Sequence, residues 1–288
     1  MTFKTVFLQL LVFLNINSFS QTGKFILKPN WKKGEVKELK VSGEFFWVVN
    51  GQKDKSSEPT KTYQIEILES NENGYLVEWK VSYNETNEDE FMQNYIDNFN
   101  YQIQLDKNGK FIELKNWHEL IELNKSLKEK IVSMVKSENI SDSEIEKQLS
   151  QMNLPLTKSE LIEWFQGLTD VYLASYGEEY QLDTVIKSPT VIPNRNFKEG
   201  IPATQVIETR TLSDNLISIN YSTIYDYDTF EKLFKENFPN QEYHESKMNS
   251  SSNYIYNSKT GWIEKIEISS ETETEFEKTG FNMNYEIK

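Results

Sequence analysis

The chain has 288 residues, of which 37% are hydrophobic and 13% aromatic, and this composition is too rich in core-forming side chains for a disordered protein. Its formal net charge of -14 at pH 7 repels phosphate backbones, so we expect no nucleic-acid partner. The chain contains no cysteine, which excludes thiol nucleophiles, thiolate metal sites and a lipid anchor on a cysteine.

The N-terminal segment has the features of a secretory signal peptide. Lys4 is its only charge, and it precedes the apolar run Val6–Leu14. Small residues two positions apart then offer a cleavage site before Gln21. The run is too short for a membrane span, which needs about 20 apolar residues. The sequence therefore predicts removal of residues 1–20 and export of residues 21–288, as a soluble protein, to the periplasm or the cell exterior.

Residues 34–115 predict a strand-rich half with antiparallel pairing. The segment is rich in β-branched and aromatic residues and alternates in part between polar and apolar positions. Two turn motifs, Asn71–Gly74 and Asp106–Gly109, end in a glycine, which supplies the positive φ that a tight hairpin needs. The predicted strands are Val36–Val49, Lys61–Leu68, Tyr75–Tyr83, Tyr101–Leu105 and Lys110–Leu114.

Residues 116–176 predict a helical insert of three amphipathic helices. Three segments place a capping residue three positions before a glutamate, and each opens a run of apolar residues at spacings of three or four. Pro155 separates the second run from the third. The capping segments are Asn116–Glu119, Ser141–Glu144 and Thr157–Glu160. We expect these helices to cover one face of the sheet.

Residues 180–288 predict a second strand-rich half. Ser250–Ser252 lie in a polar stretch that predicts a loop. The turn Ser258–Gly261 shares a Lys-x-Gly pattern with Asp106–Gly109, which either a duplicated half-sheet or two uses of good turn chemistry would explain, and we favour the second. The predicted elements are strands Ala203–Leu212, Leu216–Tyr225, Tyr254–Tyr256, Trp262–Ser269 and Phe281–Ile287, and a short helix capped by Asp228 that ends before Pro239.

No motif assigns a catalytic, cofactor-binding or metal-binding residue. His118 and Glu122 resemble part of a zinc-protease helix, but the second histidine of that motif is missing, so we expect His118 on the surface of a first helical turn. A calcium loop at Asp106–Gly109 fails because Lys115 stands where the bidentate carboxylate belongs. Nucleophile elbows and nucleotide-binding glycine motifs are also absent from the sequence. The 45 acidic residues leave a catalytic carboxylate pair open.

Three segments, Trp31–Leu39, Leu105–Trp117 and Tyr254–Ile263, resemble uncharacterised exported proteins of Gram-negative bacteria. This resemblance brings no catalytic motif and transfers no site residue. The expected architecture is also similar to that of the half-barrel lipoprotein carriers, in which a curved antiparallel sheet is covered by helices and holds acyl chains. That second likeness concerns architecture alone, and a fold does not fix a function.

The sequence thus predicts one α+β domain over residues 21–288, with a large, curved antiparallel sheet and a three-helix insert packed on one face. The aromatic residues could line a pocket or a sugar platform, but strand propensity favours a place in the core. We expect an exported, non-catalytic envelope protein without a cofactor that binds a lipid-like, apolar or amphipathic ligand, or an envelope protein, between sheet and helices. A secreted glycan hydrolase and a structural or adhesion module are the alternatives.

Overall fold

The computed structural model describes residues 23–82, 90–137, 154–194, 197–240, 242–243 and 246–288. The fold is mostly β, with 54% of the residues in strands and 22% in helices. The strands are β1 (Lys24–Ile26), β2 (Val36–Val49), β3 (Gln52–Asn71), β4 (Gly74–Ser82), β5 (Asn100–Leu105), β6 (Phe111–Leu114), β7 (Glu179–Gln181), β8 (Val185–Asn194), β9 (Phe197–Thr211), β10 (Leu216–Tyr225), β11 (Lys247–Asn257), β12 (Ile263–Glu273) and β13 (Glu277–Ile287). The helices in this part of the chain are α2 (Glu90–Asn98), α3 (Trp117–Ser137), α5 (Lys158–Leu173) and α6 (Tyr227–Asn237).

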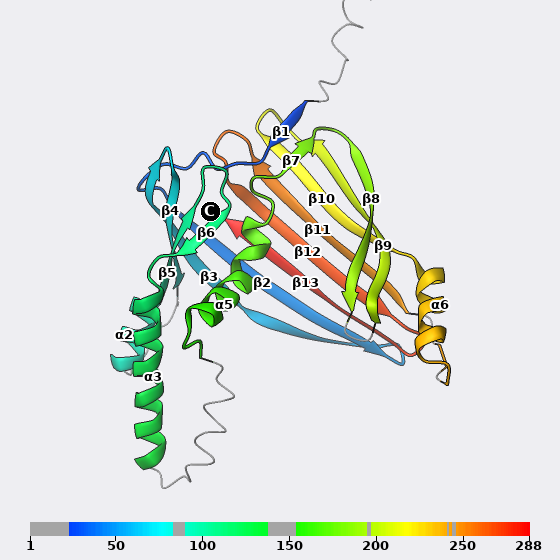
Figure 1. Ribbon diagram of the computed structural model, residues 1–288, viewed down its shortest axis with the longest axis horizontal. Helices are drawn as coiled ribbons and strands as arrows, with labels where there is room; N and C mark the ends of the chain where they lie inside the picture. The colour runs from blue at the N-terminus through cyan, green and yellow to red at the C-terminus, as the bar shows by residue number, and fades with distance from the viewer. Residues whose placement is uncertain (1–22, 83–89, 138–153, 195–196, 241, 244–245) are drawn as a thin grey trace, which may run out of the picture.

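Eleven strands form one antiparallel sheet in the order β6-β5-β4-β3-β2-β13-β12-β11-β10-β9-β8. Strands β2 to β6 and strands β8 to β13 are two meanders, and the pairing of β2 with β13 joins them into one broad, twisted layer (Figure 1). Strands β1 and β7 pair separately. The expectation of a large antiparallel sheet is confirmed.

The prediction of an α+β fold with a three-helix insert on one face is wrong. Helix α5 crosses one face of the sheet, whereas α3 and α2 lie at the β5–β6 end and α6 lies near the far ends of β9 and β10 (Figure 1). The predicted helix that begins at Ser141–Glu144 falls outside the described residues. An amphipathic stripe predicts that a helix buries one side, but it does not say against which surface, and most of the sheet face beyond α5 is not covered by α2, α3 or α6.

Several strands are longer than the sequence predicts. Strand β3 begins before Lys61, and β11 begins before Tyr254, so that Ser250–Ser252 belong to a strand instead of a loop. Ladder hydrogen bonds to a neighbour on each side override the weak strand propensity of serine and asparagine. Helix α2 interrupts the half that the sequence predicts as strands alone.

The caps of two helices test the predicted capping boxes. At α5 the box is confirmed, because the Thr157 N–H donates to Glu160 Oε2 over 2.9 Å and the Glu160 N–H donates to Thr157 Oγ1 over 3.3 Å. At α6 the prediction is wrong: the cap is Asp226 instead of Asp228, and Asp226 Oδ1 accepts from the Thr229 N–H over 3.0 Å.

The segment that follows β1 packs between two hairpin turns. Gly109 and Gly261 have φ angles of +87° and +74°, and a Cβ at either position would lie 2.8 Å from an atom of Pro29. At Gly261 the same Cβ would lie 2.1 Å from the backbone nitrogen of Asn30. Both Lys-x-Gly turns therefore require glycine for their own backbone and for the close approach of one shared segment.

The core lies between α5, the β1–β7 pair and the part of the sheet that they cover. Tyr172 of α5 packs edge-on against Trp79 of β4 with ring centroids 5.7 Å apart, and Trp262 is 1% exposed. Twelve of the described aromatic residues are buried, as strand propensity favours. Others are exposed, among them Phe45 and Trp47, at 40% and 39%, and also Trp164 and Phe276.

Candidate functional site

An open hollow of about 670 Å³ lies on the sheet face that α5 crosses, beside the end of that helix. This volume falls within the range of roughly 300–1,000 Å³ that is typical of small-molecule sites. We call it the trough. Its principal lining residues are Ile186, Ile207, Tyr221, Ser252, Ile268 and Phe281 of the sheet and Ser175, Glu178 and Tyr180 of the segment after α5.

The register of the sheet explains why these side chains share one face. In one row Ile207 lies opposite Tyr221 across β9 and β10, and Ser252 lies opposite Ile268 across β11 and β12. Residues directly opposite each other in antiparallel strands point to the same side. The next row toward the core is buried and comprises Thr209, Ile219, Tyr254 and Ile266. The trough is therefore the open continuation of the core face.

Apolar side chains continue from the trough across β13 to β2. Phe281 lies opposite Phe45, with ring centroids 6.0 Å apart. Single exposed apolar residues are ordinary on protein surfaces, but a contiguous group beside a hollow is typical of a binding surface. Six interstrand spacings of about 4.8 Å separate β8 from β2, so this face is about 29 Å wide.

Small hydroxyl residues form the floor of the trough. Ser252 stands between Tyr221 and Ile268 in its row, and Ser250 stands between Thr223 and Ser270 in the next. Small side chains between larger ones leave a furrow along the strands. The polar residues around Ser250–Ser252 predict a loop, whereas these serines belong to β11, whose sequence signal is the strand pattern of Tyr254–Tyr256.

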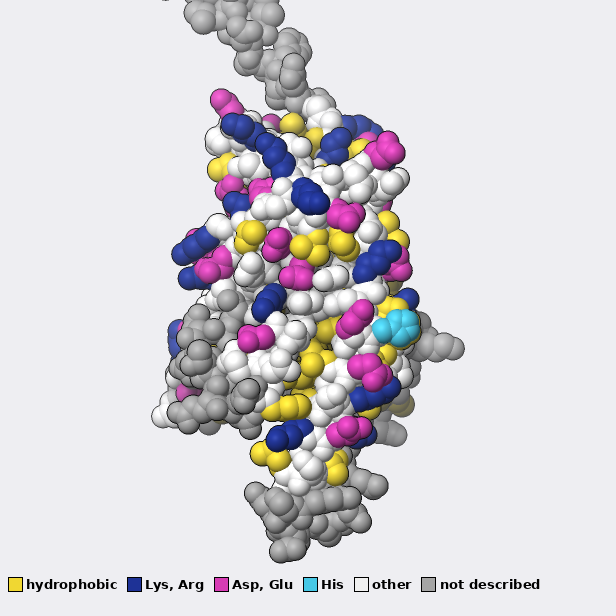
Figure 2. All heavy atoms as spheres, turned by 90° about the vertical axis from the view of Figure 1, so that its left-hand side faces the viewer, with side chains coloured by type: hydrophobic (Ala, Val, Ile, Leu, Met, Phe, Trp, Pro, Cys, Tyr) yellow, Lys and Arg dark blue, Asp and Glu magenta, His cyan; other side chains and the backbone are white. Residues whose placement is uncertain are grey.

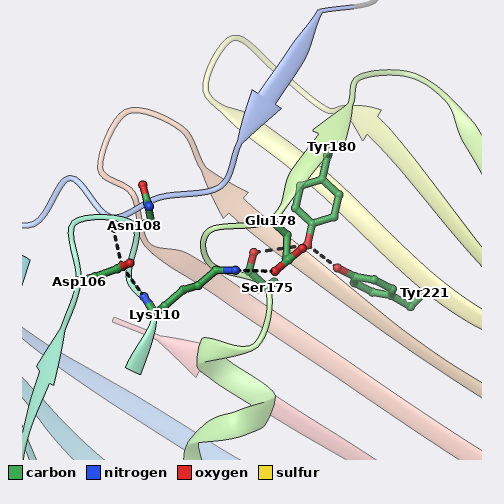
Figure 3. Close-up of polar contacts among 7 residues, drawn as sticks. All are labelled: Asp106, Asn108, Lys110, Ser175, Glu178, Tyr180 and Tyr221. Carbon is green, nitrogen blue, oxygen red and sulfur yellow. Dashed lines mark hydrogen bonds and ion pairs between the residues drawn. The ribbon is translucent and has the colours of Figure 1, made fainter. Parts of the chain in front are cut away.

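A group of hydrogen-bonded hydroxyls lines the trough where the chain leaves α5 (Figure 3). The hydroxyl oxygens of Tyr180 and Tyr221 lie 2.5 Å apart, and the Tyr180 hydroxyl donates to the main-chain oxygen of Ser175 over 3.4 Å. Ser175 is 3% exposed, and its Oγ has no hydrogen-bond partner among the residues that the structure describes. A buried hydroxyl without a partner is uncommon in native proteins and carries a free-energy cost. Sequence reasoning gave no sign of this group.

The trough carries little net charge. Its charged lining residues are Glu178, whose carboxylate pairs with Lys110 Nζ at 2.9 Å, and Glu179, which pairs with Lys24 Nζ at 2.7 Å. Figure 3 shows the Glu178–Lys110 pair linking the segment after α5 to the β5–β6 turn. Each acid thus has its own counter-charge at the rim.

The phenols of the trough stay neutral at physiological pH. Burial raises the pKa of Tyr180 above its ordinary value, and the hydrogen bond and charge interaction with Tyr221 raise it further. Burial also raises the pKa of Tyr221, to which the nearby Glu178 carboxylate adds. Both side chains are therefore hydrogen-bonding groups without charge.

A second hollow, of about 730 Å³, lies on the opposite face of the sheet and has a charged lining. Hydrogen bonds from Lys55 and Lys265 hold the pKa of Glu44 and of Glu267 below the ordinary glutamate value. A glycosidase acid needs the reverse, a raised carboxyl pKa. This hollow gives no support to a catalytic carboxylate pair.

The other candidates from the sequence have structural roles in the described residues. His118 is exposed, as predicted. The Asp106 carboxylate accepts from the backbone N–H groups of Asn108 and Lys110 at 2.8 and 2.9 Å, so it shapes a turn (Figure 3). Within the part of the chain that the structure describes, no group of three or more His, Cys, Asp or Glu side chains is placed to hold a metal ion.

The α2–α3 side of the molecule has hydrophobic side chains scattered among charged ones (Figure 2). Ile112, Met134 and Trp164 are each about half exposed. None of the helices in the described ranges combines the length and the apolar character that a bilayer crossing requires. We assign no site to this side because nothing in the structure shows what it binds.

Comparisons of the sequence with protein-family models and with curated proteins found no match.

Proposed function

We propose that the protein is an exported, non-catalytic binding protein that holds an apolar chain in the trough. The observation that carries this proposal is the group of partly exposed apolar side chains, in two neighbouring rows of the sheet, that continues the core face into an open hollow. Ile207, Ile268 and Phe281 are all part of that surface. A face of this kind leaves apolar area in contact with water, and covering it with a ligand is favourable.

Energetics favour a long chain over a small solute. Each buried CH₂ group contributes about 0.8 kcal/mol. Association costs at least about 4 kcal/mol in lost freedom of motion. About five buried CH₂ groups offset that cost, and further groups produce net affinity. The width of the face between β8 and β2 provides room for such a chain.

The expected likeness to half-barrel lipoprotein carriers points in the same direction. Those carriers hold acyl chains on a curved antiparallel sheet that helices cover, and the likeness here extends to the large antiparallel sheet and to α5, which crosses one of its faces. The signal peptide predicted at residues 1–20 would deliver the protein to the compartment in which such carriers act.

The proposal is tested with the mature protein and N-phenyl-1-naphthylamine, an uncharged apolar dye that fluoresces when it leaves water. We expect saturable binding. The variant Ile207→Asp, which places a charge in the trough, should weaken binding at least tenfold, because a carboxylate beside the dye resists loss of its water.

A matched control uses the neighbouring position of the same strand. Val206 points to the other face of β9 and is also partly exposed. The variant Val206→Asp should bind the dye as the unmodified protein does. Absence of saturable binding, or equal losses in both variants, would contradict the proposal and favour a structural or adhesion module.

A further inference from the structure

One end of the sheet exposes a group of large apolar side chains. Val49 at the end of β2 pairs with Glu277 at the start of β13, so the β2–β3 and β12–β13 turns lie side by side there. Trp47 and Val49 precede the first turn and are 39% and 44% exposed, and Phe276 lies in the second turn and is 64% exposed. Neighbouring apolar side chains that remain in water to this extent are typical of an interaction surface.

Helix α6 lies at the same end, which we call the α6 end and which comprises α6 and the two turns. The helix lies between β10 and β11, and β11 begins at this end because Lys247 pairs with Glu273 at the end of β12 (Figure 1). Its apolar residues recur at spacings of three or four, yet none of its residues, all of which the structure describes, is buried. Phe234 of α6 lies against Phe238 and Tyr243, with ring centroids 5.3 and 5.4 Å away, and all three remain partly exposed. An amphipathic helix of this kind is suited to the plane of a membrane interface.

The composition and charge of the α6 end fit a lipid surface. Its apolar side chains belong to two turns and one helix, and the interface of a bilayer accepts such separate anchors, tryptophan and tyrosine above all. A protein partner needs one complementary surface of about 800 Å² instead. Glu273, Glu275 and Glu277 flank Phe276, so an anionic surface would be repelled and a phospholipid without net charge is favoured.

The trough reaches toward the α6 end. Its lining residues Thr223 and Phe281 lie two residues before the end of β10 and four residues after the start of β13, which is at most about 13 Å from the turns at about 3.3 Å per residue. The Phe281 ring lies 6.0 Å from the ring of Phe45, which is 40% exposed. Apolar side chains therefore connect the trough with the exposed end of β2, so a chain held in the trough can enter or leave a bilayer there.

We infer that the α6 end docks on a bilayer of phospholipids without net charge, and that Trp47, Val49 and Phe276 enter the boundary between its headgroups and acyl chains. This inference goes beyond the proposed function, because docking requires no ligand in the trough. It assigns a role to α6, which buries none of its residues. It also specifies which tryptophan meets the acyl chains.

The first test measures how the mature protein partitions onto vesicles of phosphatidylcholine, by flotation through a density gradient. Phe276→Asp and Val49→Asp should each weaken binding at least about fivefold, because an apolar contact is lost and a carboxylate resists loss of its water. Leu212→Asp is the matched control and should bind as the natural protein does, because Leu212 is 53% exposed in the β9–β10 turn at the opposite end of the sheet. Addition of phosphatidylglycerol, which is anionic, should not strengthen binding.

A second test reports the orientation of the docked protein. Phosphatidylcholine with brominated acyl chains quenches the fluorescence of a tryptophan that reaches those chains. The natural protein should be quenched, and Trp47→Phe should lose most of that quenching while it still binds the vesicles. Trp164→Phe should keep the quenching, because Trp164 is 49% exposed but lies in α5, away from the α6 end.

The outcomes separate this inference from the proposed function. Absence of vesicle binding, an equal loss in Leu212→Asp, or quenching that depends on Trp164 instead of Trp47 would overturn docking by the α6 end, and dye binding in the trough would still stand. Self-association that Phe276→Asp abolishes, without vesicle binding, would identify a second copy as the partner and would also overturn it. Ile207→Asp should float with the vesicles as the natural protein does, so a failure of the trough to bind the dye leaves the docking result intact.

Discussion

The unpartnered hydroxyl of Ser175 predicts a variant that is more stable than the natural protein. A buried donor without an acceptor costs about 1–3 kcal/mol relative to a satisfied one. Ser175→Ala removes that group and leaves the backbone oxygen, which accepts from Tyr180, in place. The variant therefore measures the effect of the Ser175 hydroxyl alone, without a change in the hydrogen bond to the Ser175 main-chain oxygen.

The magnitude follows from two opposing terms. Removal of the unsatisfied hydroxyl contributes about 1–3 kcal/mol to folding, and the small void left by one oxygen atom offsets up to about 1 kcal/mol of it. We expect the free energy of unfolding to rise by about 1 kcal/mol. For a chain of this size that corresponds to an increase in Tm of about 2–4 °C.

Urea unfolding followed by tryptophan fluorescence, together with calorimetry, measures both quantities on the mature protein. An equal slope of free energy against urea in the two proteins would attribute the change to stability. If Ser175→Ala lowered the free energy of unfolding by 1 kcal/mol or more, as loss of an ordinary hydrogen bond does, Oγ would have a partner and the reasoning would be refuted.

Three further predictions concern the Gly261 turn, the carboxylate of Glu160 and the N-terminus of the exported protein. Gly261→Ala should destabilise the protein by about 3 kcal/mol or more, because its φ of +74° is unfavourable for alanine and its Cβ would lie 2.1 Å from Asn30 N; urea unfolding close to that of the natural protein would contradict the close approach. The pKa of Glu160 lies below its ordinary value because the Leu156 N–H hydrogen-bonds to its carboxylate. The stability that this carboxylate contributes is therefore present above pH about 4.3 and is lost as the pH falls through the lower pKa of the folded state. Between pH 5 and about 3, the Glu160→Gln variant should lose less stability than the natural protein, and parallel losses in the two proteins would argue against the Leu156–Glu160 hydrogen bond. Intact-mass measurement of the exported protein should give a chain that begins at Gln21, and a retained N-terminus would refute the predicted cleavage.

Much of the strand pattern could be predicted from local signals. The predicted bounds of Val36–Val49 and Leu216–Tyr225 match β2 and β10, because alternation and β-branched residues are strong there. The glycine turns at Gly74, Gly109 and Gly261 each join a pair of antiparallel strands as expected. Strand bounds and hairpin turns depend on residues that are close together in the sequence, so the spacing of apolar residues and the positions of glycines predict them.

The covering of the sheet and the site could not be predicted, because both depend on contacts between distant residues. The apolar stripes of α3 and α5 look alike in the sequence, yet α5 lies across the sheet face and α3 lies at its end (Figure 1). Ser252 becomes a trough residue only through its pairing with Tyr221 and Ile268. Ser175 is distinguished by a buried hydroxyl that has no hydrogen-bond partner among the described residues, and no sequence pattern reveals such an absence.

The most direct test of the central claim, that the trough binds an apolar chain, is the affinity of the mature protein for the straight-chain alcohols from octanol to tetradecanol. Full burial of one CH₂ group corresponds to about fourfold in affinity, and a chain lying in an open trough buries about half of each group. We therefore predict an increase of about twofold for each added CH₂, abolished in Ile207→Asp and retained in Val206→Asp. An affinity that does not change with chain length would contradict the account.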